Sequence, residues 1–142
     1  MKYQKEKTTL NMGSISLSNF VFDEDSLGIT MDILEVSDEL KNEIQKSIEI
    51  EKENHTIHRK EMKEYYPDYP QYTWSEVPVI IDSCFLEVYL RKGKKISYSI
   101  NTIFHDSKNN HLEACAVTVI DLTQYEELLK KEVLKILIDN FF

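Results

Sequence analysis

The residues best suited to metal chemistry are two histidines three positions apart, His55 and His58, with carboxylates nearby at Glu51 and Glu61. On a helix this spacing places both imidazoles on one side, where two histidines and a carboxylate can bind zinc or iron. The stretch lacks the HExxH or paired ExxH pattern of such sites, and charged residues are dense throughout it. We therefore interpret it as a solvated helix surface and expect neither a metal nor a cofactor.

The two cysteines, Cys84 and Cys115, are the candidate nucleophiles. A catalytic thiol needs a histidine within hydrogen-bonding distance. His105 and His111 flank a polar turn, with Asp106 beside the first, and we interpret this turn as surface. Both cysteines stand among apolar residues in predicted strands, where a free cysteine behaves as a small hydrophobic side chain. We expect reduced, structural thiols.

Glycine-rich phosphate-binding loops are not predicted. The chain has three glycines, and the patterns GxSxG, GxxxxGK[ST], GxGxxG and CxxC do not occur in it. No residue can therefore be assigned a catalytic role, and an enzyme is the less favoured interpretation.

The net charge bounds the class of partner. The chain of 142 residues carries 25 acidic and 17 basic side chains, for a formal charge of −8. Binding to nucleic acid or to an anionic membrane needs basic patches, so both are disfavoured. The sequence shows no apolar targeting segment at its N-terminus and no apolar run of about 18 residues. We expect a cytoplasmic protein, and the abundance of Lys, Ile, Asn and Glu is typical of a bacterial or phage sequence.

Charge is also segregated along the chain. Residues 8–40 contain seven acids and no Lys or Arg, and residues 64–90 contain five acids and again no Lys or Arg. Positive charge gathers in residues 41–63 and in the motif RKGKK at 91–95. This pattern fits either a solvated surface or an acidic face that docks a basic partner.

The most unusual stretch is EYYPDYPQYTWSEVP, residues 64–78, which holds all three prolines, the only tryptophan and four of the eight tyrosines. Pro67 and Pro70 forbid helix continuation and favour an extended chain. Long aromatic loops are often functional, and Tyr and Trp are enriched in interface hot spots. We expect Tyr72 and Trp74 to be buried and the other tyrosines to be exposed. The predicted partner-binding residues are Tyr65, Tyr66, Asp68, Tyr69, Tyr72, Trp74 and Glu76.

The elements that must position this stretch follow from hydrophobic periodicity. Strands are expected near 15–22, 28–36, 79–90, 96–104 and 112–121, the last as a central strand. A charged helix begins at Ser37 or Asp38 and runs to about His55 or beyond, and a second begins at a capping box formed by Thr123 and Glu126. The order ββαβββα predicts an α+β fold, with an antiparallel sheet of about five strands backed by two helices. We expect residues 1–12 to be loose and 13–142 to form a single domain.

Three functions fit these observations. The first is a protein-binding module that acts through an acidic surface rich in Tyr and Trp, such as a toxin-immunity or inhibitor protein with a basic partner. The second is a small-molecule-binding or enzymatic domain with a pocket between the sheet and the C-terminal helix. The third is a structural homo-oligomer, such as a homodimer, joined through an edge strand or the aromatic loop.

Overall fold

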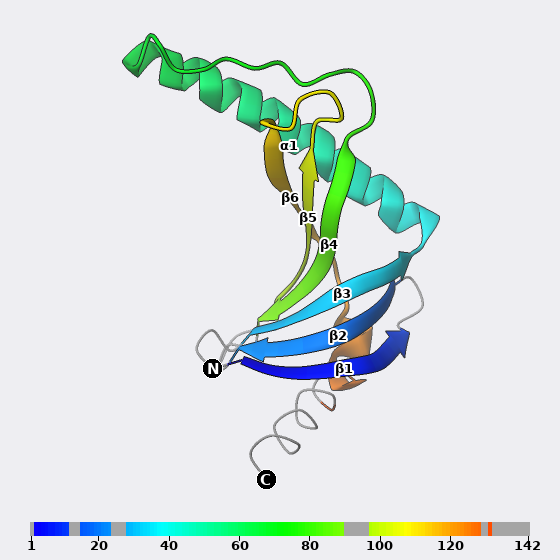
Figure 1. Ribbon diagram of the computed structural model, residues 1–142. Coiled ribbons are helices and arrows are strands. Elements are labelled where there is room, and N and C mark those ends of the chain that lie inside the picture. Colours follow the sequence, from blue (N-terminus) through cyan, green and yellow to red (C-terminus); the bar gives the residue numbers. More distant parts are fainter. Residues whose placement is uncertain (1, 12–14, 24–27, 90–96, 129–130, 132–142) are drawn as a thin grey trace.

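The computed structural model describes residues 2–11, 15–23, 28–89, 97–128 and 131. Within these ranges the chain forms one antiparallel sheet of six strands in sequential order, with a long helix inserted between the third and fourth strands (Figure 1). The elements are β1 (Lys2–Asn11), β2 (Ile15–Asp23), β3 (Gly28–Val36), α1 (Asp38–Tyr65), β4 (Ile80–Tyr89), β5 (Ser97–His105), β6 (Glu113–Val119) and the 3₁₀ turn η1 (Thr123–Tyr125). The predicted α+β class is confirmed.

The start of the chain differs from the sequence-based expectation. Residues 1–12 were expected to be loose, but Lys2–Asn11 form β1 and pair with β2. The segment KYQKEKTTLN has no strong apolar alternation, so its strand character comes from pairing with β2 rather than from its own pattern. The sheet therefore has one strand more than predicted.

The sheet bends at β2. The β2–β3 register shifts between Ser18 and Val21, and Asn19 within this shift has a positive φ of 55°. Asparagine tolerates this left-handed conformation better than most residues. Its side-chain amide donates a hydrogen bond of 2.9 Å to the Asp32 carboxylate on β3, which fixes the bulge.

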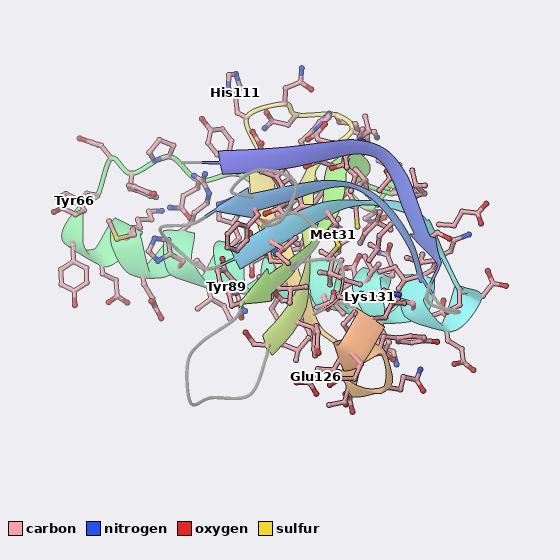
Figure 2. All side chains as sticks on the ribbon, turned by 90° about the horizontal axis from the view of Figure 1, so that it is seen from below. Met31, Tyr66, Tyr89, His111, Glu126 and Lys131 are labelled. Carbon is pink, nitrogen blue, oxygen red and sulfur yellow. The ribbon has the colours of Figure 1, made fainter. Side chains whose placement is uncertain are left out.

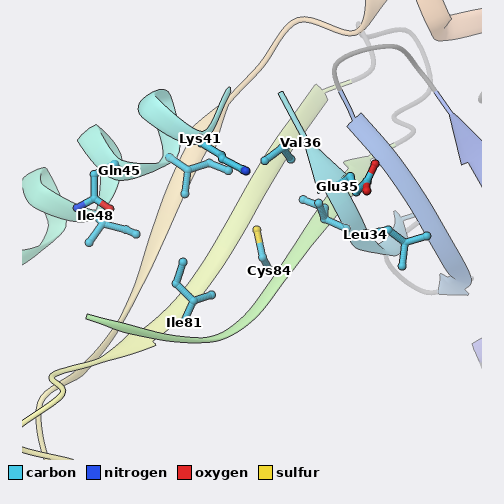
Figure 3. Close-up of a pocket in the computed structure, with 10 residues that line it drawn as sticks. Leu34, Glu35, Val36, Lys41, Gln45, Ile48, Ile81 and Cys84 are labelled. Carbon is cyan, nitrogen blue, oxygen red and sulfur yellow. The ribbon is translucent and has the colours of Figure 1, made fainter. Parts of the chain in front are cut away.

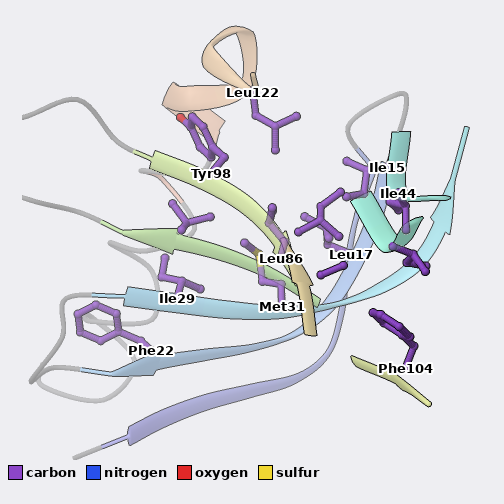
Figure 4. Packing of buried hydrophobic residues seen from close by; sticks show 14 residues of the cluster. Ile15, Leu17, Phe22, Ile29, Met31, Ile44, Leu86, Tyr98, Phe104 and Leu122 are labelled. Atoms are coloured by element: carbon purple, nitrogen blue, oxygen red, sulfur yellow. The ribbon is translucent and has the colours of Figure 1, made fainter. Parts of the chain in front are cut away.

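The main core lies on the face of the sheet that α1 covers. Ile29 and Met31 of β3 pair with Val88 and Leu86 of β4, and all four side chains are buried. Other members of this cluster, including Ile44, Phe104 and Leu122, are shown in Figure 4. Fully burying one such side chain contributes about 1.5–3 kcal/mol, so this layer supplies most of the stability.

Helix α1 begins where the sequence predicts. The Ser37 hydroxyl accepts a hydrogen bond of 3.2 Å from the Leu40 N–H, and Asp38 and Glu39 occupy the first turn, where the helix dipole favours acids. The helix has 28 residues and is about 42 Å long. It ends at Tyr65, because Pro67 disfavours the helical conformation for the residue before it.

Only the first part of α1 is packed on the sheet. Its buried side chains are Ile44 and Ile48, and the helix continues beyond the end of the strands (Figure 1). We call residues 52–65 of α1 together with residues 66–79, which run back along the helix, the arm. Residues 66–79 alone are called the strap.

Two local predictions near the C-terminal end are wrong. Within the described residues, β6 pairs with β5 alone, so it is an edge strand rather than a central one. One of its two faces points outward, and the side chains of Val117 and Val119 on that face are 54% and 82% exposed. The N-cap is also displaced by one residue, because Leu122 rather than Thr123 is the N-cap of η1, and the Asp121 carboxylate accepts the Thr123 N–H at 3.0 Å. The RKGKK turn and most of the predicted C-terminal helix lie outside the described residues.

Candidate functional site

The strap is held to α1 by reciprocal hydrogen bonds around one arginine. The Arg59 guanidinium donates to the Pro70 carbonyl at 2.9 Å, and the Gln71 side-chain amide donates to the Arg59 carbonyl at 2.8 Å. The Tyr69 N–H also donates to the Tyr66 carbonyl at 2.8 Å, which closes the turn after the helix. These bonds make the strap run antiparallel to the helix it has just left.

The same guanidinium lies against two of the predicted tyrosines. Its carbon is 4.9 Å from the ring centroid of Tyr72 and 5.8 Å from that of Tyr69. A cation over an aromatic face is worth about 0.5–1 kcal/mol at an exposed site. Arg59 thus holds Tyr69 and Tyr72 against one side of the helix.

Trp74 connects the arm to the core. Its ring lies 5.4 Å from that of Phe104 on β5 and 5.6 Å, edge-on, from that of His55 on α1. The Lys52 ammonium is 5.9 Å from the same indole ring. Aromatic pairs at these separations add about 0.5–1.5 kcal/mol beyond burial. Trp74 is therefore mainly a structural anchor of the strap.

A buried carboxylate fixes the next residue of the strap. Asp106, in the β5–β6 turn, accepts hydrogen bonds from the Ser75 N–H at 2.6 Å and the Ser75 hydroxyl at 2.7 Å. It also accepts the Lys108 N–H at 2.8 Å. Burial alone would raise the pKa of Asp106, but the bonds from Ser75 and from the Lys108 and Asn109 backbone outweigh it and lower the pKa to about 2. We call Asp106 and its two hydrogen bonds to Ser75 the Asp106 latch. Because its pKa is about 2, the Asp106 carboxylate is ionised near neutral pH.

The tyrosines divide into two groups by exposure. Tyr65 and Tyr66 are 77% and 60% exposed, and Figure 2 shows Tyr66 at the far end of α1. Tyr72 is 37% exposed, although it was expected to be buried, and Tyr69 is half-buried, although it was expected to be exposed. Both differences follow from Arg59, which holds these two rings at the surface of the helix rather than against the sheet.

The charge of the arm is more mixed than the strap sequence alone suggests. Asp68 and Glu76 are exposed, and no Lys or Arg is near them in sequence. Folding brings the strap against α1, so residues 52–79 together carry five acids and four bases. The arm is therefore a weakly acidic aromatic surface rather than a uniformly acidic one.

The two histidines of α1 have different surroundings. His55 accepts a bond of 3.3 Å from the Arg59 Nε–H and packs on Trp74, whereas His58 is exposed. Burial first, then the positive charges of Arg59 and His58, lower the pKa of His55. No cluster of three metal-ligating side chains occurs among the residues that the structure describes.

The two cysteines and His105 each have their own polar surroundings. Burial raises the pKa of Cys84, and its sulfur lies 3.5 Å from the Thr102 hydroxyl. Burial, together with Glu87 and Glu51, raises the pKa of Cys115, which is exposed on the edge strand rather than enclosed as predicted. His105 pairs with Asp82 at 2.8 Å. Both thiols therefore remain protonated near neutral pH.

A hollow lies at the other end of α1, near its first turns. It has a volume of about 620 Å³ and lies between the end of β3, the first turns of α1 and the start of β4 (Figure 3). Its lining is mainly apolar and includes Ile33, Leu34, Ile44 and Ile81. We call it the β3–β4 cleft. A separate hollow of about 600 Å³ lies at the place predicted for a pocket, between the sheet and the start of the C-terminal segment, and its lining includes Tyr98, Val119 and Glu126.

Two residues that organise the arm were not identified from sequence. Arg59 was counted among the charges of a solvated helix, and Asp106 was read only as part of a surface turn. The segment DSKNN, residues 106–110, does carry the signal of a side-chain-capped turn. No sequence pattern around Asp106 predicts its contact with Ser75, which is 31 residues away.

Comparison of the chain with protein-family models, with curated proteins and with solved structures finds no match. Of the helices in the described ranges, none combines the length and the apolar character that a membrane crossing requires.

Proposed function

We propose that the chain is a protein-binding module whose contact surface is the tip of the arm, centred on Tyr65 and Tyr66 with Asp68 beside them. The observation that carries this proposal is that two neighbouring tyrosines, 77% and 60% exposed, stand at the end of a helix that extends past its own sheet. Two such aromatic side chains at a projecting tip contribute little to the core.

The clamp around Arg59 supports the proposal. A binding surface gains affinity when its residues are ordered before the partner arrives, because less conformational entropy is lost on association. The strap, the Arg59 bonds and the Asp106 latch fix the chain on both sides of the tip. Tyrosine adds a large rigid ring with a polar end, which suits an interface hot spot.

The expected partner is a protein with a basic rim around an apolar patch. Asp68 and Glu76 are exposed on the strap, and the whole chain has a charge of −8, which favours electrostatic steering of a basic protein. A toxin-immunity pair or an inhibitor with its target has this character. Added salt should slow association, and so should Asp68→Lys and Glu76→Lys.

Photo-crosslinking tests the surface directly. A benzophenone amino acid placed at Tyr66 should crosslink one protein in a lysate of the source cells, and the same group placed at exposed Val119 is the matched control. The captured protein is then purified and its binding measured against the two charge-reversal variants. Crosslinks that join only copies of this chain, or the same set of proteins from both positions, would reject the proposed function.

A further inference from the structure

The sheet divides between β3 and β4. The two strands pair from Gly28↔Tyr89 to Asp32↔Phe85, and no further β3–β4 pair follows within the described residues. Beyond that point residues 33–36 pair with β2, and residues 80–84 pair with β5. Among the described residues, each strand therefore turns one main-chain edge without a strand partner toward the gap, and such edges are templates for another strand.

Each of these edges also carries a bulge. Leu34 has no partner between the pairs formed by Ile33 and Glu35, and Asp82 has none between those formed by Ile81 and Ser83. A bulge bends its strand and redirects side chains, and bulges are common beside binding sites. Leu34 and Ile81 are 55% and 51% exposed and line the cleft. The β3–β4 cleft therefore follows from the register shifts at Leu34 in β3 and Asp82 in β4.

The start of β4 is unusually exposed for a strand inside a sheet. The side chains of residues 80–83 are exposed on both faces of the strand, whereas those of Leu86 and Val88 further along are buried. An inner strand normally has a neighbour on each side and at least one covered face. The exposed stretch lies along the cleft, with Lys41, Ile44 and Gln45 of α1 on the third side (Figure 3).

We propose that the β3–β4 cleft binds an extended peptide segment of a partner protein, which pairs with the inner edge of β4 at Ile80–Cys84. Five residues at about 3.3 Å each give an edge of roughly 16 Å, enough for a short added strand. Main-chain hydrogen bonds would supply affinity, and alternate apolar side chains would pack on Ile33, Leu34 and Ile81. A compact ligand could cover the apolar lining but would leave the main-chain edge unpaired.

The charges of the cleft define its selectivity. Of the described residues that line it, Lys41 and Glu35 carry charge, and they have opposite signs. Selection should therefore depend on apolar side chains at alternate positions rather than on net charge. This site is independent of the proposed arm function, because Lys41 and Tyr65 are separated by about 36 Å of helix.

The test uses a phage-displayed library of random octapeptides, panned against the full chain after depletion on a Leu34→Lys/Ile81→Lys variant. Both substituted side chains are more than half exposed, so the variant should fold, and circular dichroism checks this. We expect peptides with alternating apolar residues that bind the double variant at least tenfold more weakly. Val119→Lys, on the far strand, and Tyr65→Ala/Tyr66→Ala, at the arm, should bind them as the parent does.

Backbone methylation of a selected peptide then tests the pairing itself and needs no protein variant. In an added strand, every second N–H points at β4, so N-methylation of one alternate set should abolish binding while methylation of the other set leaves it unchanged. Equal tolerance of both sets would overturn the proposal. It would also be overturned by a library that yields no enriched peptide, or by a dimer that the Leu34→Lys/Ile81→Lys variant dissociates, since the cleft would then hold a second copy of the chain.

Discussion

The two halves of α1 are held by different forces. The first half places Ile44 and Ile48 into the apolar core, and this burial holds it against the sheet, together with a hydrogen bond of 2.9 Å from the Thr118 hydroxyl of β6 to the Ser47 hydroxyl. The second half leaves the sheet and is clamped by its own strap through Arg59, Trp74 and the Asp106 latch. A helix end that projects from a core keeps its order only if other residues replace the missing burial. Here the replacement is polar and aromatic, so it can be altered without unfolding the sheet.

The largest expected effect is in the sheet-packed half. Ile48 is fully buried, and Ile48→Ala should lower the free energy of unfolding by about 2–5 kcal/mol. Denaturant unfolding followed by circular dichroism measures this change. Ile57→Ala, at a position 47% exposed on the arm, is the matched control and should change stability by less than about 0.5 kcal/mol. Equal losses for the two variants would show that the arm is part of the main core.

The latch should give the next largest effect. Asp106→Asn replaces a buried carboxylate that accepts several hydrogen bonds, and it should cost about 1–3 kcal/mol. Because the folded pKa of about 2 lies below the ordinary value of 3.8, the contribution is complete above about pH 4 and is lost as the pH falls toward 2. The stability difference between parent and variant should therefore shrink across that interval. A difference that stays constant down to pH 2 would contradict the assignment.

The Arg59 clamp should have a smaller and more local effect. Arg59→Ala removes the bond to Pro70 and the contacts to two tyrosine rings, at a cost of about 1 kcal/mol. Amide hydrogen exchange should accelerate in residues 66–72 and stay unchanged in β4–β6. Lys60→Ala, at the exposed neighbouring position, is the control and should leave both unchanged. Faster exchange throughout the sheet would mean that the arm and the core are not separable.

The smallest expected effect is a loss of stability in mild acid caused by His55. The pKa of His55 is lowered by burial and by Arg59 and His58, so the folded protein disfavours its protonation. Stability should therefore begin to fall as the pH drops below about 6.5, where the unfolded chain takes up the proton, and should stop falling below the folded pKa. The imidazole proton resonances of His55 give the pKa directly. A value above 6.5 would contradict the packing of His55 against Trp74.

Much of the fold could be predicted because its signals are local. The alternation from Gly28 to Val36 and the cap at Ser37 gave boundaries that agree with the structure. Strand β1 could not be predicted, since its sequence KYQKEKTTLN has no strong apolar alternation and pairing with β2 decides its conformation. Strand β6 was placed at the centre because its apolar residues occupy both parities, but Val117 and Val119 remain exposed at an edge.

The candidate sites were only partly predictable. The aromatic and proline content of residues 64–78 indicates the strap, but the exposure of Tyr69 and Tyr72 depends on Arg59, which approaches them only after the chain reverses at Pro67. The cleft had no signal of its own in the sequence. It depends on where β3–β4 pairing stops and on bulges at Leu34 and Asp82, which are properties of strand register.

The affinity of the arm for its crosslinked partner tests the central claim most directly. A Tyr65→Ala/Tyr66→Ala variant should raise the dissociation constant by about 30-fold or more, the effect of losing a hot spot worth about 2 kcal/mol. Its free energy of unfolding should stay within about 0.5 kcal/mol of the parent value, because both side chains are exposed. A dissociation constant within twofold of the parent value, with folding intact, would contradict the claim that the tip of the arm is the binding surface.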